Sequence, residues 1–312
     1  MVIIQLAGGL GNQMFQYALY LQLKSLGREV KIDDESGFAE DRQREPSLAP
    51  FGVAYERPEK AELQKMLDSS MLPWKRVRRK LFGRHKKSYF EASKLFIPEV
   101  LTWDDIYLEG YWQSERYFHE VEEQVRETYD TDRLIAWLTK KGLWDGENER
   151  GRAGDHAGIK SAAQYLEEIN NECSVSIHVR RGDYLTPENQ ALFGGICTDA
   201  YYEEGIRRMR ERYPQCRFYL FCNDREWKSG GIWKEEDVER VALSGNRRDA
   251  DYAEFALMSH CKHHILANSS FSWWASYLNP YPNKSVFAPD RWLNGTDCRD
   301  CYREDMEKII LH

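Results

Sequence analysis

Hydrophobic and polar positions alternate over short stretches of this chain, and segments with helical periodicity separate those stretches. The first half opens with a predicted strand at residues 2–6, a glycine-rich loop at 7–12, a helix at 13–25 and a second strand at 29–32. Such a βαβ unit favours a parallel sheet. Residues 104–112 predict a later strand of the same half.

The same alternation returns in the second half. The predicted elements are strand 174–179, helix 199–213, strand 217–222, helix 251–261, strand 264–267 and helix 270–278. Between the halves, residues 145–158 are rich in glycine and charge, which predicts a linker or insertion. We therefore predict an α/β fold of two Rossmann-like domains, residues 1–155 and 156–312, with the ligand cleft between them.

Composition narrows the class of protein. A chain of 312 residues with 42% hydrophobic residues is long enough for two domains with real cores, and its net charge of −7 argues against general nucleic-acid binding. No apolar segment is long enough to cross a bilayer, and Met1 leads directly into a strand pattern without a signal peptide. Seven cysteines, an odd number, fit reduced thiols. These features predict a cytoplasmic protein.

Two short patterns suggest metal binding. Cys298 and Cys301 form a single C-x-x-C with no second pair, and Asp249 and Asp251 form a D-x-D. The D-x-D precedes a helical pattern, where Asp251 is expected to cap or start the helix. We therefore predict no metal site.

The strand at 174–179 runs directly into a cationic turn. Arg180 and Arg181 follow it, and Gly182 allows a sharp change of direction. The carboxyl ends of strands are where open α/β sheets bind ligands, and guanidinium groups match phosphate oxygens. This arrangement predicts a diphosphate site. The alternatives are surface ion pairs, or an adhesive Arg-Gly-Asp tripeptide at 181–183, which the immediately preceding strand disfavours.

Two further strand ends carry polar side chains. Ser269 and Ser270 stand where a strand passes into a helix, so they either cap that helix, help its N-terminus bind phosphate, or do both. Asp224 follows another strand, where it either accepts hydrogen bonds from a guanine base or is an ordinary turn residue.

The glycine-rich loop resembles the loop that binds nicotinamide dinucleotides, but its spacing argues against such a site. Residues 8–13 lack the G-x-G-x-x-G pattern, and only Asp33 or Asp34 offers a later strand-end acid.

Four separated motifs resemble one family. They are GGLGNQMFQYA from Gly8, LEGYWQSERYF from Leu108, HVRRGDY from His178 and NSSFSWWA from Asn268. Together they closely resemble the α-1,2-fucosyltransferases of glycosyltransferase family 11. The resemblance implies a GT-B type fold, GDP-fucose as donor, inversion at the anomeric carbon, and no metal or other cofactor.

The resemblance also assigns roles to residues. It implies that Arg180 holds the donor diphosphate and that His178 and Asp224 lie by the guanine. The remaining expected contacts are Arg181, Ser269 and Ser270 for the donor, and Asn12, Gln13, Trp112 and Gln113 for fucose and acceptor. Residues 143–160 and the tail after Trp292 depart from the family pattern.

Two assignments remain open. Asp183 is the candidate general base for the acceptor hydroxyl, or it orients Arg180 or Arg181. Residues 74–87 carry eight Lys or Arg and His85, and this run is either a solvated helix face or a membrane-surface contact.

The sequence thus predicts an inverting galactoside α-1,2-fucosyltransferase. It would move L-fucose from GDP-β-L-fucose to a terminal galactose of an oligosaccharide or lipid-linked glycan. The alternatives are another GT-B sugar-nucleotide enzyme, and a non-catalytic protein that binds nucleotide sugars or glycans.

Overall fold

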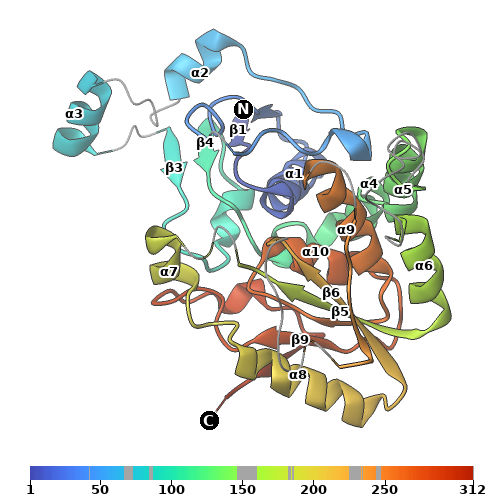
Figure 1. Cartoon of the computed structure of the whole chain (residues 1–312). Coiled ribbons are helices and arrows are strands. Elements are labelled where there is room, and N and C mark those ends of the chain that lie inside the picture. The colour runs from blue at the N-terminus through green and yellow to red at the C-terminus, as the bar shows by residue number, and fades with distance from the viewer. Residues whose placement is uncertain are drawn as a thin grey trace. The chain divides into compact units, whose positions relative to one another are not determined.

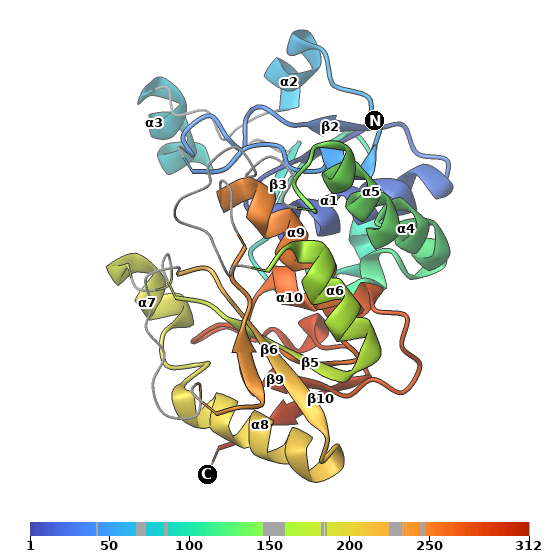
Figure 2. The ribbon, with the colours of Figure 1, turned by 45° about the vertical axis from the view of Figure 1, so that its right-hand side comes forward.

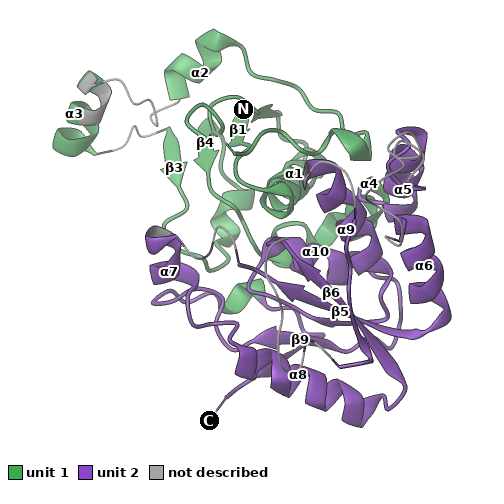
Figure 3. Cartoon of the chain, in the orientation of Figure 1, with its two compact units in different colours: residues 1–128, 299–301 green, residues 129–298, 302–312 purple. Residues whose placement is uncertain are grey.

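A computed structural model of the chain describes residues 1–41, 43–66, 73–83, 87–145, 160–181, 184, 186–224, 233, 235–243 and 247–311. The chain forms two compact units (Figure 3): unit 1 holds residues 1–128 and 299–301, and unit 2 holds 129–298 and 302–312. The boundary expected from sequence lies after residue 155, in a segment whose residues 146–159 are outside the described ones. The units instead divide after Thr128.

Unit 1 is built on a four-stranded parallel sheet with strand order β2-β1-β4-β3 (Figure 1). Its strands are β1 Val2–Gln5, β2 Val30–Asp33, β3 Ser88–Phe90 and β4 Ile106–Glu109. Its helices are α1 Leu10–Ser25, α2 Lys60–Met66, α3 Pro73–Phe82 and α4 Glu122–Thr128. Short 3-10 helices span Ala49–Phe51, Pro98–Leu101, Glu115–Tyr117, His119–Val121 and Arg299–Cys301.

Helix α1 begins earlier than its sequence pattern predicts. Gly9 is the N-cap residue, and its carbonyl accepts hydrogen bonds from the backbone N–H groups of Asn12 (3.0 Å) and Gln13 (3.1 Å). The preceding Gly8 has φ +77°, a conformation that other residues adopt at a cost. Asn12 therefore lies in the first turn of a helix, and the prediction that places it in a loop is wrong.

Unit 2 contains a six-stranded parallel sheet with strand order β10-β9-β8-β5-β6-β7. Its strands are β5 Cys173–Val179, β6 Cys216–Cys222, β7 Val238–Arg240, β8 His263–Ile265, β9 Val286–Pro289 and β10 Met306–Ile309. Its helices are α5 Thr131–Lys140, α6 Ala162–Asn171, α7 Pro187–Phe193, α8 Asp199–Arg212, α9 Arg247–His260 and α10 Ser270–Leu278. Figures 1 and 2 show α8 on one face of the sheet and α6, α9 and α10 on the other. The prediction of two Rossmann-like α/β regions is confirmed.

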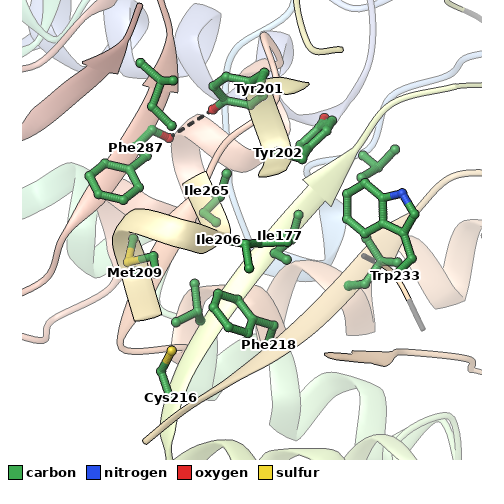
Figure 4. Packing of buried hydrophobic residues seen from close by; sticks show 14 of the residues in the cluster. Ile177, Tyr201, Tyr202, Ile206, Met209, Cys216, Phe218, Trp233, Ile265 and Phe287 are labelled. Carbon is green, nitrogen blue, oxygen red and sulfur yellow. Dashed lines mark hydrogen bonds between the residues drawn. The ribbon is translucent and has the colours of Figure 1, made fainter. Parts of the chain in front are cut away.

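The face of β5 toward α8 supplies the apolar core of unit 2 (Figure 4). Val175, Ile177 and Val179 alternate along β5 and belong to one buried cluster with residues of α8 and of neighbouring strands. Among these are Tyr201, Tyr202, Ile206, Met209, Phe218, Ile265 and Phe287. The Tyr201 hydroxyl donates to the Leu266 carbonyl at 2.6 Å and lies 3.4 Å from the Phe287 carbonyl, so the buried phenol keeps a polar partner.

The opposite face of β5 is polar and yet buried. The Ser176 hydroxyl lies 2.8 Å from Nδ1 of His264, and the Asn279 side-chain amide donates to His264 Nε2 at 2.7 Å. Since both ring nitrogens have partners, His264 is fully enclosed without losing a hydrogen bond. Burial, reinforced by Lys284 and Arg303, holds the pKa of His264 well below 6.5. Burial likewise lowers the pKa of the adjacent His263 to about 4.

These histidines predict acid sensitivity. Their folded pKa values lie below the unfolded value of 6.5, so the unfolded chain takes up protons first as the pH falls. The stability that these neutral histidines contribute is therefore fully present well above pH 6.5 and is lost as the pH falls below it. Between about pH 7.5 and 5.5, the free energy of unfolding should fall by roughly 1 kcal/mol for each histidine that stays neutral in the folded state. Urea unfolding at the two pH values measures this.

A matched pair of variants assigns the acid effect. His263→Phe keeps an aromatic ring against Tyr213, whose ring centroid is 3.9 Å away, and should reduce the pH dependence. His119→Phe, on the exposed surface, should leave it unchanged. An equal pH dependence in wild type and His263→Phe would contradict the assignment to this histidine.

The structure also bears on the predicted start of the helix near Asp251 and on the prediction that no segment crosses a membrane. Helix α9 begins at Arg247, so Asp249 and Asp251 both lie inside it, and the prediction that Asp251 starts the helix is wrong. Within the described part of the chain, no helix combines the length and the apolar character that crossing a bilayer requires.

Candidate functional site

Three strand ends of unit 2 converge on one edge of its sheet. Strands β8, β5 and β6 are parallel neighbours, so their carboxyl ends lie together. Arg180 and Arg181 follow β5 directly, and Asn223 follows β6. The backbone N–H of Arg181 donates to Asn223 Oδ1 at 2.8 Å, which fixes the start of the cationic turn against the next strand end.

A hollow of about 360 Å³ opens at this edge. It is lined by Arg180, Arg181, Tyr184, Gln190, Phe193, Gly194, Gly195, Cys197 and Asn268. The hollow therefore joins the two cations of the turn to the segment after β8 and to the end of α7. Two guanidinium groups on one concavity suit an anionic ligand with several oxygens.

Tyr184 forms an aromatic wall that orients Arg180. The Arg180 guanidinium lies 5.1 Å from the centroid of the Tyr184 ring. The Tyr184 ring itself is held at two points. It stacks on Phe193, with centroids 4.4 Å apart and planes at 16°. Its hydroxyl donates to the Asn268 carbonyl at 2.9 Å. A cation–π contact on a ring fixed at two points restricts where the guanidinium points.

Asn268 is fixed in turn by two side-chain contacts. Its amide nitrogen donates to the Trp292 carbonyl at 3.1 Å, and its Oδ1 accepts the Cys197 thiol at 3.4 Å. Burial raises the pKa of Cys197 to about 12, so the sulfur keeps its proton and acts as a donor. The position of Asn268 therefore does not depend on a ligand.

Ser269 is the N-cap residue of α10. Its hydroxyl accepts from the backbone N–H of Phe271 at 3.3 Å, and Ser270 is the first residue of the helix. Neither serine is among the described residues that line the hollow. The capping role is thus present, and a role in donor binding stays a prediction.

His178 is the penultimate residue of β5 and is 3% exposed. Its ring lies against Phe271 of α10, with centroids 5.5 Å apart. Burial, with a smaller contribution from Arg180, holds its pKa well below 6.5, so the ring is neutral. Its Nδ1 has no hydrogen-bond partner among the described residues. A neutral ring with an unused nitrogen suits an uncharged partner better than a phosphate.

Asp224, another predicted residue, does not line the hollow. The backbone carbonyl of Asp224 accepts from Arg240 at 2.6 Å, and Asp224 is not among the described residues that line the hollow. Asp183 lies outside the described residues.

In unit 1, the structure brings Asn12 and Gln113 together. The Gln113 amide donates to Asn12 Oδ1 at 2.7 Å, and both side chains are half-buried. A Cβ atom on Gly8 would lie 2.7 Å from Asn12 Nδ2, so this glycine leaves the space that the asparagine occupies. The GGLGNQ motif thus places Asn12 and makes room for it.

Gln13 and Trp112 are enclosed within unit 1. The Gln13 amide donates to the carbonyls of Gly8 (2.8 Å) and Glu45 (3.0 Å) and accepts from the Ser47 N–H (2.7 Å). Trp112 has no exposed surface. Both side chains therefore organise unit 1 in this structure, and their expected substrate contacts stay predictions.

Sequence reasoning missed several residues that shape these sites. In unit 2 it missed Tyr184 and Phe193, although Tyr184 belongs to the HVRRGDY motif and an aromatic beside a cationic turn is a usable signal. In unit 1 it missed Glu91, whose buried carboxylate accepts the N–H groups of Tyr111 (2.9 Å) and Trp112 (3.1 Å). No local signal links Glu91 to that turn.

The strand-end acids of unit 1 are engaged inside the unit. The Tyr107 hydroxyl donates to Asp33 at 2.7 Å, and Asp34 accepts from Tyr55 (2.7 Å) and Arg57 (2.6 Å). Neither carboxylate therefore supports the nicotinamide interpretation. Among the described residues, no group of three or more His, Cys, Asp or Glu side chains is arranged to hold a metal ion.

Comparison with known proteins identifies the class of enzyme. Residues 141–294 match the family described as Glycosyl transferase family 11, and this segment contains every described residue that lines the hollow. The chain is a glycosyltransferase, and its two parallel α/β units agree with the GT-B type predicted.

Relatives extend the likeness over most of the chain. An alpha-1,2-colitosyltransferase of Escherichia coli is 29% identical over 94% of this chain and 92% of its own length. The galactoside alpha-(1,2)-fucosyltransferase 1 of Homo sapiens is 28% identical over 87% of this chain and 63% of its own length. A solved fucosyltransferase, NodZ from Bradyrhizobium, superposes with a TM-score of 0.43 at 13% identity, covering 93% of this chain and 96% of NodZ.

Proposed function

We propose that this glycosyltransferase is an inverting galactoside α-1,2-fucosyltransferase, which moves L-fucose from GDP-β-L-fucose to the 2-hydroxyl of a terminal galactose. The observation that carries the proposal is the hollow at the carboxyl edge of the unit 2 sheet, where Arg180 and Arg181 face one cavity. Relatives named as galactoside alpha-(1,2)-fucosyltransferases support the sugar and the linkage.

The two arginines would bind the donor diphosphate, with Ser269, Ser270 and the N-terminus of α10 as further donors. His178, neutral and enclosed, would contact the guanine base, together with Asp224. The difficult event in the reaction is the departure of GDP while positive charge develops on the fucose ring. Each fixed donor on the leaving diphosphate contributes about 3 to 4 kcal/mol by analogy with oxyanion sites.

The acceptor hydroxyl must lose a proton during the transfer. Asp183 would take that proton, or it would orient the arginines. Asn12, Gln13, Trp112 and Gln113 of unit 1 would position fucose and acceptor. Because fixed cations would neutralise the diphosphate, no metal is required in this proposal.

A transfer assay tests the function. The chain is incubated with GDP-fucose and a soluble β-galactoside, and both GDP release and the linkage of the product are measured. A product with fucose α-linked to the galactose 2-hydroxyl is expected, and exhaustive chelation should leave the rate unchanged. GDP binding without release would indicate a non-catalytic binding protein. A rate lost with chelator and restored by Mn²⁺ would make Asp249 and Asp251 candidate ligands.

A colitose donor is the second candidate, because the first of the relatives above is a colitosyltransferase. Colitose is fucose without its 3-hydroxyl. A site that binds this hydroxyl should prefer GDP-fucose strongly, since the missing group would leave buried polar atoms without a partner. Competition between GDP-fucose and GDP-colitose for one limiting acceptor decides between the two donors.

The aromatic wall gives a graded prediction. Tyr184→Leu removes the ring beneath Arg180 and should weaken GDP binding by about tenfold, the value of one cation–π contact and one stacked pair. Tyr184→Phe keeps the ring and loses only the hydrogen bond to Asn268, so it should bind GDP more tightly than the leucine variant. Isothermal titration with GDP measures both. Equal affinity in the two variants would exclude a role for the ring.

The location of this enzyme stays a prediction. A cytoplasmic enzyme would meet GDP-fucose directly, and its acceptor would be an oligosaccharide or a lipid-linked glycan.

A further inference from the structure

Helix α3 differs in charge from the rest of the chain. Its ten residues, Pro73–Phe82, read PWKRVRRKLF and hold five Lys or Arg and no acidic residue. The whole chain has a net charge of −7. This local excess of positive charge is therefore opposite in sign to the protein that bears it.

The same helix exposes large apolar side chains. Phe82, Leu81 and Trp74 are 77%, 68% and 66% exposed, the three highest values among the large hydrophobic side chains that the structure describes. Val77 is 57% exposed. A soluble surface normally scatters such residues singly, so four of them on about three helical turns indicate a contact surface.

Helical spacing gathers these side chains on one face. Trp74, Val77 and Leu81 are three and four residues apart, so they form one stripe, and Phe82 widens it. The other Lys and Arg positions of the helix fall outside this face, except Arg78, which lies between Trp74 and Phe82. An apolar stripe bordered by cations is the pattern of a helix that lies in a membrane interface.

We propose that α3 docks this enzyme on an anionic lipid bilayer. Trp74, Leu81 and Phe82 would enter the boundary between headgroups and acyl chains, while the Lys and Arg residues would meet lipid phosphates. Charge complementarity favours this occupant over a neutral or basic surface, and the exposed apolar side chains favour it over a surface that is only acidic. A nucleic acid would match the cations, yet it would leave the exposed aliphatic residues without an apolar partner. The proposal is independent of the donor sugar.

Vesicle flotation of the full chain tests the proposal. Vesicles of phosphatidylcholine alone are compared with vesicles that also contain phosphatidylglycerol, at low and high salt. We expect binding to the anionic vesicles at least about tenfold tighter than to the neutral ones, and weaker binding at high salt. Equal binding to both vesicle types would overturn the charge argument.

Matched variants distinguish binding through α3 from non-specific binding through any exposed apolar side chain. Leu81→Ser with Phe82→Ser should reduce vesicle binding at least about tenfold, because two inserted side chains are lost. Ile310→Ser with Leu311→Ser removes another exposed apolar pair, 56% and 46% exposed, and should bind like wild type. Unchanged binding in the α3 variant, or retention on RNA in place of vesicles, would refute the proposal.

Activity on a soluble acceptor keeps this test apart from the proposed function. The Leu81→Ser, Phe82→Ser variant should transfer sugar to a soluble galactoside at the wild-type rate. If the wild-type chain transfers sugar but does not bind anionic vesicles, only the proposed membrane contact is refuted. A chain that binds vesicles but does not transfer would refute only the enzymatic proposal.

Discussion

Replacing Arg180 by alanine is expected to abolish sugar transfer and to weaken GDP binding. The guanidinium lines the hollow at the end of β5 and is placed over the Tyr184 ring. Loss of one fixed donor to a leaving group typically costs about 100- to 1000-fold in turnover. Arg180→Lys should recover little of this, because an ammonium group cannot bind two oxygens in one plane or stack on the ring as a guanidinium does. Steady-state kinetics and GDP titration measure both effects.

An arginine of the same unit serves as the control. Arg207 on α8 is 54% exposed and pairs with Glu204 at 2.8 Å. Surface pairs of this kind contribute little to stability, so Arg207→Ala should behave like wild type. Near-normal transfer by a folded Arg180→Ala variant would contradict the assignment of this hollow to the donor diphosphate.

The elements of unit 2 that position this arginine were predictable because their signals are local. Strand β5 and helix α10 follow from short stretches of hydrophobic periodicity, and the observed bounds of both agree with the predicted ones within one residue. The cationic turn is also local, since Arg180 and Arg181 follow β5 in sequence. What sequence could not supply is the partner of each group.

Partners come from distant segments. Tyr184 stacks on Phe193 of α7 and donates to Asn268 after β8, and no short-range pattern encodes either contact. The polar face of β5 shows the same limit. The alternation along β5 does not reveal that Ser176 is buried or that His264 of a neighbouring strand is the hydrogen-bond partner of its hydroxyl.

Two helix starts, those of α1 and α9, were predicted too late, because glycine and charged residues are also typical of loops. Gly9 and Gly11 made residues 7–12 look like a loop, whereas Gly9 caps α1 and Gly11 lies inside it. The charged sequence at the start of α9 concealed its first turn in the same way. Both errors assigned candidate residues to the wrong kind of segment. Asn12 lies in helix α1, and Asp249 and Asp251 lie in helix α9.

That helical setting makes Asn12→Ala the second decisive substitution. If unit 1 positions fucose and acceptor while unit 2 holds GDP, the variant should lose turnover by roughly tenfold to a hundredfold. Its GDP affinity should stay within about twofold of wild type, because in this division of roles the substitution removes no contact to the phosphates. The alternative is a purely structural role, in which Asn12 only holds Gln113, whose amide donates to Asn12 Oδ1 at 2.7 Å.

Urea unfolding and turnover, measured on the same Asn12→Ala protein, separate these two roles. The variant should lose about 1 kcal/mol of unfolding free energy, the usual net value of one hydrogen bond. If Asn12 meets the substrate, turnover falls by the expected factor although the variant is fully folded in the assay. Turnover within about twofold of wild type in the folded variant would reduce Asn12 to a structural residue. A parallel loss of GDP affinity and turnover in Asn12→Ala would mean that unit 1 also takes part in holding the nucleotide.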